Sequence, residues 1–372
     1  MRKRSITLVD IAKALDISIG TVHRALHNNP GVSPETRGKV LETAKALGYR
    51  PNLAARYLSS KKTLRISVNT LKGSTSFWDE VRSGIREEAA SAPLQQFEIE
   101  FRTYPKLGEG EVDAIESAIH EDVDGIIIFP GQPQMLRSWM RRAERAHIPV
   151  VCVATDAPQS GRVGIVAVDT LASGAIAADL MGRFLAGREG EIALSLFDTA
   201  ITEHAEKYSA FESTLRASYP NLHLLKPIED HGLEEEAYSN CRQLFDAYPN
   251  LVGFYVTTEA SIPVLKAAED AGRLKDLTII TTDLFAGLVP HIRSGAVAAT
   301  IYQRPRTQGR MAFRMLHEAL VDGGVSSPEV GLAPHLVMRG NLDFFLQGQS
   351  KETIPKEGHS YESAQELAED LA

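Results

Sequence analysis

The sequence is poor in cysteine and in long apolar runs, and both shortages narrow the class of protein. Its 372 residues include two cysteines, Cys152 and Cys241, far apart and without a CxxC motif. We therefore expect two buried thiols in a reducing cytoplasm rather than a disulfide framework. No apolar run approaches the roughly eighteen residues of a membrane helix. The basic start, MRKRSITLVD, has no apolar stretch behind it, so we expect no secretory signal.

Common catalytic signatures are also absent. The sequence has no GxxxxGK[ST], GxSxG or HExxH motif, because His120-Glu121 is followed by Asp-Val-Asp instead of a second histidine. The eleven histidines are scattered without metal-ligand spacing. We predict a binding protein with no catalytic residues, no cofactor and no metal.

Charge divides the chain into a basic head and an acidic body. Residues 1–62 hold twelve Lys and Arg against four Asp and Glu, whereas the remaining 310 residues hold 28 against 44. An apolar content of 43% is that of a globular protein, and the length favours two or three packed units. The uneven charge predicts a polyanionic partner for the head alone. A solvated basic tail is the alternative.

Three short helices are predicted in the head, which we place at 1–49. Each follows a residue that can cap a helix, namely Thr7, Ser18 and Ser33. The turn between the first two is short, and a loop precedes the third, so the order is that of a helix-turn-helix unit. We predict that the buried face of the third helix is formed by Val40, Leu41, Ala44 and Leu47.

The stretch SIGTVHRALH, residues 18–27, has the composition of a helix that reads DNA. Base edges lie close to the N-terminus of such a helix, which favours small or polar side chains there. Arg24 could bind guanine through two hydrogen bonds, and Ile19 could touch a thymine methyl group. The predicted DNA-contacting residues of this stretch are Ser18, Ile19, Gly20, Thr21, His23 and Arg24. The candidates for phosphate contacts are Arg2, Lys3, Arg4, Thr7, Ser33, Thr36 and Arg37. Ser33 as a mere cap and His23 as a solvated side chain remain alternatives.

The head resembles a known family over about fifty residues. The segment TLVDIAKALDISIGTVHRALHNNPGVSPETRGKVLETAKALGYRPNLAARYL is similar to the DNA-binding head of the LacI/GalR family of bacterial transcription regulators. The resemblance implies that Ile19 and Gly20 set operator choice. It also implies a hinge helix within 50–63 that folds on DNA, where Asn52 caps the helix and Leu58 enters the minor groove beside Ala55.

Beyond residue 63 the pattern is that of an α/β protein. Strand-like apolar runs occur at 64–70, 97–103, 123–130, 148–154, 190–196, 251–256 and 277–282. Helix-period segments lie between them, which predicts parallel sheets covered on both faces. We place an effector domain at 64–345, followed by a polar acidic tail at 346–372. Its N-lobe would comprise about 64–168 and 303–332, and its C-lobe about 169–302 and 333–345.

This body is similar to the two-lobed, type I periplasmic-binding fold that the family uses to bind effectors. The resemblance implies effector contacts from motifs such as STSFWDEVRSGI, TDAPQSGR and TTDLF. The implied contact residues are Phe77, Trp78, Asp156, Arg162, Lys207, Thr257, Asp283 and Gln303. Asp169 could join them or could only cap a helix. Trp78 could instead be a core residue.

Two departures from the family pattern leave the effector open. Lys207 stands where arginine is frequent, and Thr257-Thr258 where an Asn-Asp pair is common. Lysine cannot offer the planar fork of arginine. A polyol, a cyclitol or an acidic sugar therefore remains open beside plain sugars.

The resulting hypothesis is a cytoplasmic, homodimeric repressor that binds a near-palindromic double-stranded DNA operator under the control of a sugar-like effector. A solute-binding protein for transport and a regulator with a ligand-blind pocket are the alternatives.

Overall fold

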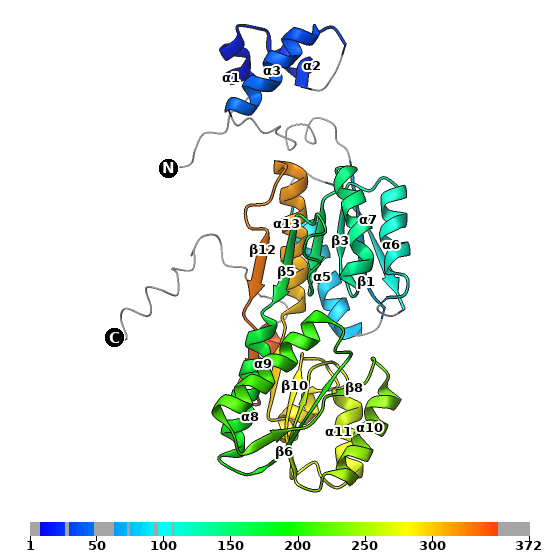
Figure 1. Ribbon diagram of the computed structural model, residues 1–372, viewed down its shortest axis with the longest axis vertical. Helices are drawn as coiled ribbons and strands as arrows, with labels where there is room; N and C mark the ends of the chain where they lie inside the picture. Colours follow the sequence, from blue (N-terminus) through cyan, green and yellow to red (C-terminus); the bar gives the residue numbers. More distant parts are fainter. Residues whose placement is uncertain are drawn as a thin grey trace, which may run out of the picture.

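The computed structural model describes residues 8–26, 30–47, 63–72, 75–92, 96–105 and 108–348. Figure 1 shows a small helical head and a larger body of two lobes. Four predicted DNA contacts lie outside the described residues, namely Thr7, Asn52, Ala55 and Leu58. The predicted acidic tail lies outside them from residue 349 onward.

The head is a bundle of three short helices. They are α1 (Leu8–Leu15), α2 (Ile19–Leu26) and α3 (Pro34–Leu47). Their shared core consists of Ile11, Ala12, Val22, Ala25, Val40 and Ala44. The predicted face of α3 is only half right, because Leu41 is 49% and Leu47 39% exposed. The bundle confirms the predicted helix-turn-helix plan.

The first lobe is built on a parallel sheet of six strands in the order β12-β5-β4-β3-β1-β2. These strands are β1 (Leu64–Leu71), β2 (Phe97–Tyr104), β3 (Gly125–Ile128), β4 (Val150–Val153), β5 (Gly164–Val168) and β12 (Glu329–Leu332). Its helices are α5 (Thr75–Ser91), α6 (Glu111–His120), α7 (Pro133–Arg145) and α13 (Pro305–Asp322). α5 and α13 pack on one face of the sheet and α6 and α7 on the other. Burial on both faces explains why the central strands β3 and β4 are apolar throughout, whereas the edge strand β2 alternates apolar with charged residues.

The second lobe repeats this plan with a seven-stranded sheet. Its strands are β6 (Gly190–Leu196), β7 (Leu222–Leu224), β8 (Ile228–Glu229), β9 (Leu251–Val256), β10 (Thr278–Thr282), β11 (Ala299–Tyr302) and β13 (His335–Val337). Its helices are α8 (Thr170–Leu185), α9 (Thr202–Ser218), α10 (Glu234–Ala247), α11 (Ser261–Asp270), α12 (Val289–Ser294) and α14 (Leu342–Gly348). Only β13 runs antiparallel to its neighbour, β11. The mixed α/β class predicted for the body is confirmed.

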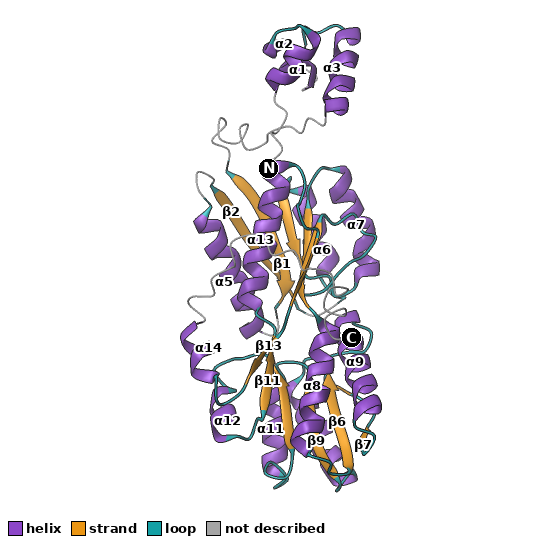
Figure 2. Ribbon diagram, turned by 90° about the vertical axis from the view of Figure 1, so that its left-hand side faces the viewer, coloured by secondary structure: helices purple, strands orange, loops and turns teal. Residues whose placement is uncertain are grey.

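The chain passes between the lobes three times, as Figure 2 shows. The passages join β5 to α8, β11 to α13 and β12 to β13. Three short connecting segments allow the two lobes to move as rigid bodies about a hinge while their facing edges stay close.

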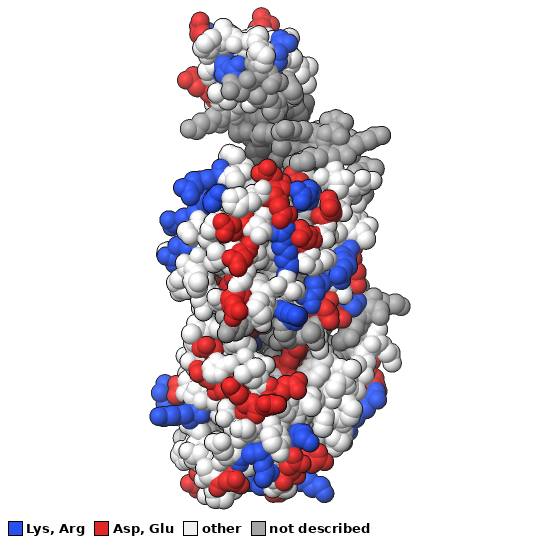
Figure 3. Space-filling model, turned by 90° about the vertical axis from the view of Figure 1, so that its right-hand side faces the viewer, with Lys and Arg blue, Asp and Glu red and all other residues white. Residues whose placement is uncertain are grey.

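Charged side chains of both signs cover the body. On the face shown in Figure 3, acidic side chains gather on the second lobe next to the waist between the lobes. Within the described residues, no helix has both the length and the apolar character needed to cross a membrane.

Two glycines let α5 and α13 approach closely. A Cβ on Gly309 would lie 2.0 Å from the carbonyl oxygen of Val81, and one on Gly84 would lie 2.0 Å from that of Arg306. We expect Gly309→Ala to lower the free energy of unfolding by about 1–3 kcal/mol, because the two helix backbones must separate. Urea unfolding measures this loss. Gly331→Ala in the same lobe, where a Cβ meets nothing within 4 Å, should be near neutral. Equal effects of the two substitutions would contradict the close-packing argument.

Candidate DNA interface and ligand pocket

The N-terminus of α2 presents an exposed surface. Ile19 is 48% exposed although it is a large apolar residue, and Gly20 and Arg24 are exposed as well. On the opposite side, Val22 and Ala25 are buried in the head core. The helix therefore exposes an apolar side chain at its first residue and an arginine in its second turn.

Two serines cap the helices of the head. The backbone N–H of Thr21 donates to Ser18 Oγ (N···O 3.1 Å), and that of Thr36 donates to Ser33 Oγ (3.2 Å). In each pair the two hydroxyl groups are 2.8 Å apart. A guanidinium nitrogen of Arg24 lies 3.5 Å from Thr21 Oγ1. Ser33 thus does act as a cap, and a phosphate contact would be additional. The His23 side chain lies outside the described part of the structure.

A cavity of about 430 Å³ lies between the lobes. It sits where strands of both sheets reach their carboxyl ends, the usual place for ligands in open α/β sheets. Aromatic rings form much of its wall, contributed by Phe77, Trp78, Phe129, Phe197 and Phe285. Trp78 packs edge-on against Phe77, with ring centroids 4.8 Å apart, and is only 3% exposed. It is therefore both a core residue and part of the wall.

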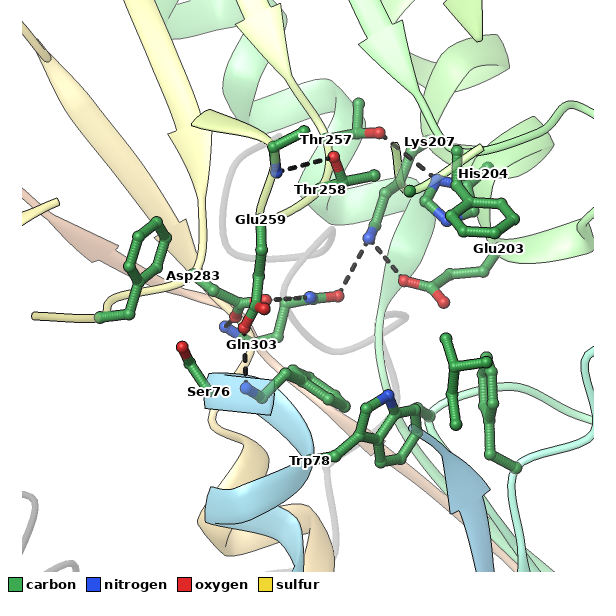
Figure 4. Close-up of a pocket in the computed structure, with 18 of the residues that line it drawn as sticks. Ser76, Trp78, Glu203, His204, Lys207, Thr257, Thr258, Glu259, Asp283 and Gln303 are labelled. Carbon is green, nitrogen blue, oxygen red and sulfur yellow. Dashed lines mark hydrogen bonds and ion pairs between the residues drawn. The ribbon is translucent and has the colours of Figure 1, made fainter. Parts of the chain in front are cut away.

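A continuous polar network crosses the cavity, drawn in Figure 4. Lys207 Nζ donates to Glu203 Oε1 (2.5 Å) and to Gln303 Oε1 (3.0 Å). Gln303 in turn donates from Nε2 to Asp283 Oδ2 (2.7 Å) and from its backbone N–H to Oδ1 (3.1 Å). α9 supplies Glu203 and Lys207, and the ends of β10 and β11 supply the other two residues.

Burial and pairing set the protonation of this network. Burial opposes the charge on Lys207, but Glu203 beside it holds the pKa of the ammonium group above its usual value. Burial likewise opposes ionisation of Glu203, yet Lys207 keeps the pKa of that carboxyl below its usual value. Burial raises the pKa of Asp283 to about 6, against the hydrogen bonds from Gln303. The Glu203–Lys207 pair is therefore ionised, whereas Asp283 can take up a proton near neutral pH.

Glu259 joins the two lobes across the cleft. Its Oε1 accepts a hydrogen bond from the backbone N–H of Phe77 (2.7 Å), which lies in the first turn of α5 in the other lobe. Burial, followed by the charge of Asp283, raises the pKa of Glu259 to about 7. On the second lobe, His204 Nδ1 lies 3.3 Å from Thr257 Oγ1, and burial lowers the pKa of His204 to about 4.

Six of the predicted effector contacts therefore line one cavity, namely Phe77, Trp78, Lys207, Thr257, Asp283 and Gln303. Thr258 also lines it and donates to Asp230 (3.4 Å). Among the described residues, no group of three or more His, Cys, Asp or Glu is arranged to hold a metal ion.

The structure places Asp156 and Arg162 outside the lining of this cavity, and their contact with the effector stays a prediction. The segment that holds them folds back on β4, since the N–H of Val163 donates to the carbonyl of Val150. Arg162 donates to the two carboxylate oxygens of Asp156 from Nε and Nη2, and its Nη2 lies 3.3 Å from Glu329. Neither side chain lines the cavity. Asp169 is a helix cap, accepting from the N–H of Ala172 (2.8 Å).

Several wall residues escaped the sequence analysis. Glu203 had a visible signal, because it precedes Lys207 by four residues on a helix, the spacing of a favourable ion pair. Glu259 follows a strand end only two residues after Thr257. No sequence motif marks the three other aromatic residues of the wall, Phe129, Phe197 and Phe285. Only the packing of the two lobes brings their rings together.

Removing the charge of Glu259 should stabilise the unliganded protein. Its raised pKa means that folding favours the protonated form, so this group's stabilising contribution is present below about pH 4 and lost as pH rises through about 7. We expect Glu259→Gln to raise the free energy of unfolding at pH 8 by about 1–3 kcal/mol, because glutamine can still accept from Phe77. Urea unfolding at pH 5 and 8 measures the difference. The exposed control Glu235→Gln should change little, and a destabilised Glu259→Gln at pH 8 would contradict the argument.

Comparison with known proteins identifies both parts of the chain. Residues 7–52 match the family described as bacterial regulatory proteins, lacI family, and residues 66–324 match the periplasmic binding protein domain. The chain belongs to the periplasmic binding protein domain family over most of its length and carries a lacI-family DNA-binding head. It is a DNA-binding transcriptional regulator with a periplasmic-binding-type body, which confirms the family and function predicted from the sequence and disfavours a transport protein.

Relatives of this chain include catabolite control protein A from two organisms. The protein from Staphylococcus epidermidis is 27% identical over 350 residues, covering 90% of this chain and 99% of the relative. The protein from Priestia megaterium is 33% identical over 151 residues, 41% of this chain and 44% of that relative.

Solved structures similar to this chain show the fold of its body. A glucose-galactose binding protein, GanP from Geobacillus stearothermophilus, has a TM-score of 0.70 at 21% identity and covers 76% of this chain and 99% of its own. A solute-binding protein from Burkholderia graminis, in complex with D-arabinose, has a TM-score of 0.69 at 24% identity, covering 76% and 97%.

Proposed function

We propose that the pocket binds a small polyhydroxylated effector, a sugar or polyol, and that its occupancy sets the affinity of the head for an operator. The observation that carries the proposal is the cavity of about 430 Å³, with aromatic rings on its walls and the Lys207–Gln303–Asp283 network across it. Carboxylates and amides suit neighbouring hydroxyl groups, and an aromatic ring suits the apolar face of a sugar. The sugar-binding structures of the same fold support this class of ligand.

Closure of the lobes is the step that links pocket to DNA in this proposal. Glu259 accepts a hydrogen bond from Phe77 across the cleft. An effector bound between the two lobes therefore changes the balance between their open and closed arrangements. Two chains pair through their bodies and place two heads on a near-palindromic operator. Closure then biases whether the hinge segments can fold on DNA. A coupling of about 1–3 kcal/mol is ordinary for such a switch. In this proposal the protein is a cytoplasmic repressor, and its pocket binds without catalysing a reaction.

On the DNA side, we assign base reading to α2. Ile19 and Gly20 lie exposed at its N-terminal end, next to the capping residue Ser18, and Arg24 lies exposed in its second turn. The remaining assignments rest on the family resemblance, and these residues are Thr7, His23, Ser33, Thr36, Asn52, Ala55 and Leu58.

Replacing Arg24 separates base reading from phosphate binding. We expect Arg24→Ala to cost about 1–3 kcal/mol on the preferred operator and to flatten its ranking over single-base variants. Arg37→Ala, at a candidate phosphate contact, should weaken all DNA about equally. Fluorescence anisotropy against a set of operator variants measures both. An unchanged ranking in Arg24→Ala would remove this residue from base recognition.

Thermal unfolding tests the effector proposal. The purified chain is heated with pentoses, hexoses, polyols, inositols and sugar acids in turn. A ligand at 100 times its dissociation constant should stabilise the protein by about 2.7 kcal/mol, which shifts the transition visibly. Silence across the panel, with operator binding intact, would reject a sugar effector and favour a ligand-blind regulator.

A further inference from the structure

The charge of the pocket wall is strongly negative. Four carboxyl groups line the cavity, those of Glu203, Glu234, Glu259 and Asp283, and among the described lining residues the only ammonium group is that of Lys207. His204 adds no charge at neutral pH, because burial lowers its pKa to about 4. Lys207 is already neutralised by Glu203 at 2.5 Å. Within the described part of the wall, an acidic ligand would therefore meet acidic side chains and no basic side chain that is not already paired.

Three of these carboxyl groups have no basic side chain of the described residues in contact: Glu234 is exposed, whereas Glu259 is half-buried and Asp283 is buried. The last two follow the ends of the neighbouring strands β9 and β10, and Figure 4 shows their side chains converging above the first turn of α5. Glu259 accepts from the N–H of Phe77, and Asp283 accepts from Gln303. Asp79 of α5 adds a third negative charge near Glu259, although Arg82 pairs with it at 2.8 Å. Lys207 and Glu203 act on Asp283 from α9 with opposite signs.

We propose that the effector carries a protonated amine that binds between the carboxyl groups of Glu259 and Asp283. This inference rests on the proposed function and names its ligand class: an amino sugar or amino polyol rather than a neutral or acidic one. An ammonium group supplies three donors, which suits two carboxylates whose other contacts are neutral hydrogen-bond donors. The ring of Phe77 from the first lobe and that of Phe285 from the second also line the cavity and can add a cation–π attraction.

The titration of the empty pocket agrees with this geometry. In the absence of a ligand the pKa values of Glu259 and Asp283 are raised to about 7 and about 6, by burial first. An incoming ammonium group stabilises both ionised carboxylates, so binding near pH 6.5 should release protons. Affinity for the amine should therefore fall as pH falls below about 7.

Matched sugars test the inference. Calorimetry at pH 7 compares D-glucosamine, D-galactosamine and D-mannosamine with their parent hexoses, their N-acetyl forms and D-glucuronate. We expect at least one amine to bind tenfold or more tightly than its parent and its N-acetyl form, with proton release near pH 6.5 seen as a buffer-dependent heat. Glu259→Gln should weaken binding of the amine at least tenfold more than it weakens binding of the parent hexose. Glu235→Gln, an exposed site outside the cavity, should change neither.

The outcomes separate this inference from the proposed function. If a parent hexose or glucuronate binds as tightly as every amine, the amine inference is overturned and the sugar effector stands. If no compound in this panel binds, the amine inference is overturned, and the wider thermal-unfolding panel decides separately whether the effector is a sugar or polyol. Should Glu259→Gln fail to fold, the comparison of amine with parent on the unmodified protein still decides the matter.

Discussion

Lys207→Met is expected to lower the free energy of unfolding of the body by about 3–5 kcal/mol, since it removes one partner of a buried ion pair. The Lys207 side chain is only 1% exposed and that of Glu203 12%. Methionine fills a similar volume but leaves the Glu203 carboxylate without its compensating charge and Gln303 Oε1 without its donor. Urea unfolding, monitored by circular dichroism, measures the loss.

Two controls separate charge from packing in this experiment. The double variant Lys207→Met with Glu203→Gln removes both charges and should recover most of the lost stability, because an uncharged pair no longer requires compensation. Lys39 and Glu35 form a pair with the same four-residue spacing, 2.8 Å apart, but with side chains 63% and 80% exposed. Lys39→Met should cost less than about 1 kcal/mol. A loss below about 1 kcal/mol in Lys207→Met alone would refute the claim that the pair stabilises the pocket.

Operator affinity should depend steeply on salt, and this is the largest change that we expect. If the basic head contacts six to ten phosphates, affinity should fall about 10³- to 10⁵-fold between 50 and 200 mM salt, because each neutralised phosphate releases condensed counterions. The head has the charge for this, with twelve Lys and Arg against four Asp and Glu in residues 1–62, whereas the body is acidic. Anisotropy titrations over a salt series give the slope of log affinity against log salt.

The same titrations distinguish phosphate contact from base reading. The slope of log affinity against log salt changes by about −0.9 for each phosphate that the protein neutralises. It should be similar for the preferred operator and for a variant operator that still binds tightly. Specific binding should stay tighter than non-specific binding throughout the series. A slope near zero would mean that the basic head does not carry the binding.

The hydrophobic periodicity of short segments predicted the helices of the head and the strands of the lobes, because each helix or strand buries one or both of its faces. The caps at Ser18 and Ser33 and the apolar strands follow from residue type and spacing alone. The exposed Leu41 and Leu47 show the limit, because the small bundle buries only a narrow stripe of α3, at Val40 and Ala44.

The pocket residues were predictable where the family resemblance supplied a motif. Asp283 and Gln303, which follow strand ends, and Lys207, on a helix, line the cavity, whereas Asp156 and Arg162 pair with each other in a turn outside it. Glu259 could not be found from spacing, since its partner Phe77 is 182 residues away and on the other lobe. Contacts between lobes depend on how the two sheets face each other, which local periodicity does not encode.

The most direct test of the account is the affinity of the full chain for its operator, measured with and without the effector. The operator comes from selection of bound sequences out of random duplex DNA, and the effector from the thermal-unfolding panel. We predict a near-palindromic operator whose dissociation constant changes about 5- to 150-fold at saturating effector, corresponding to a coupling of about 1–3 kcal/mol. An unchanged dissociation constant, with the effector shown to occupy the pocket, would contradict the coupling of pocket to DNA.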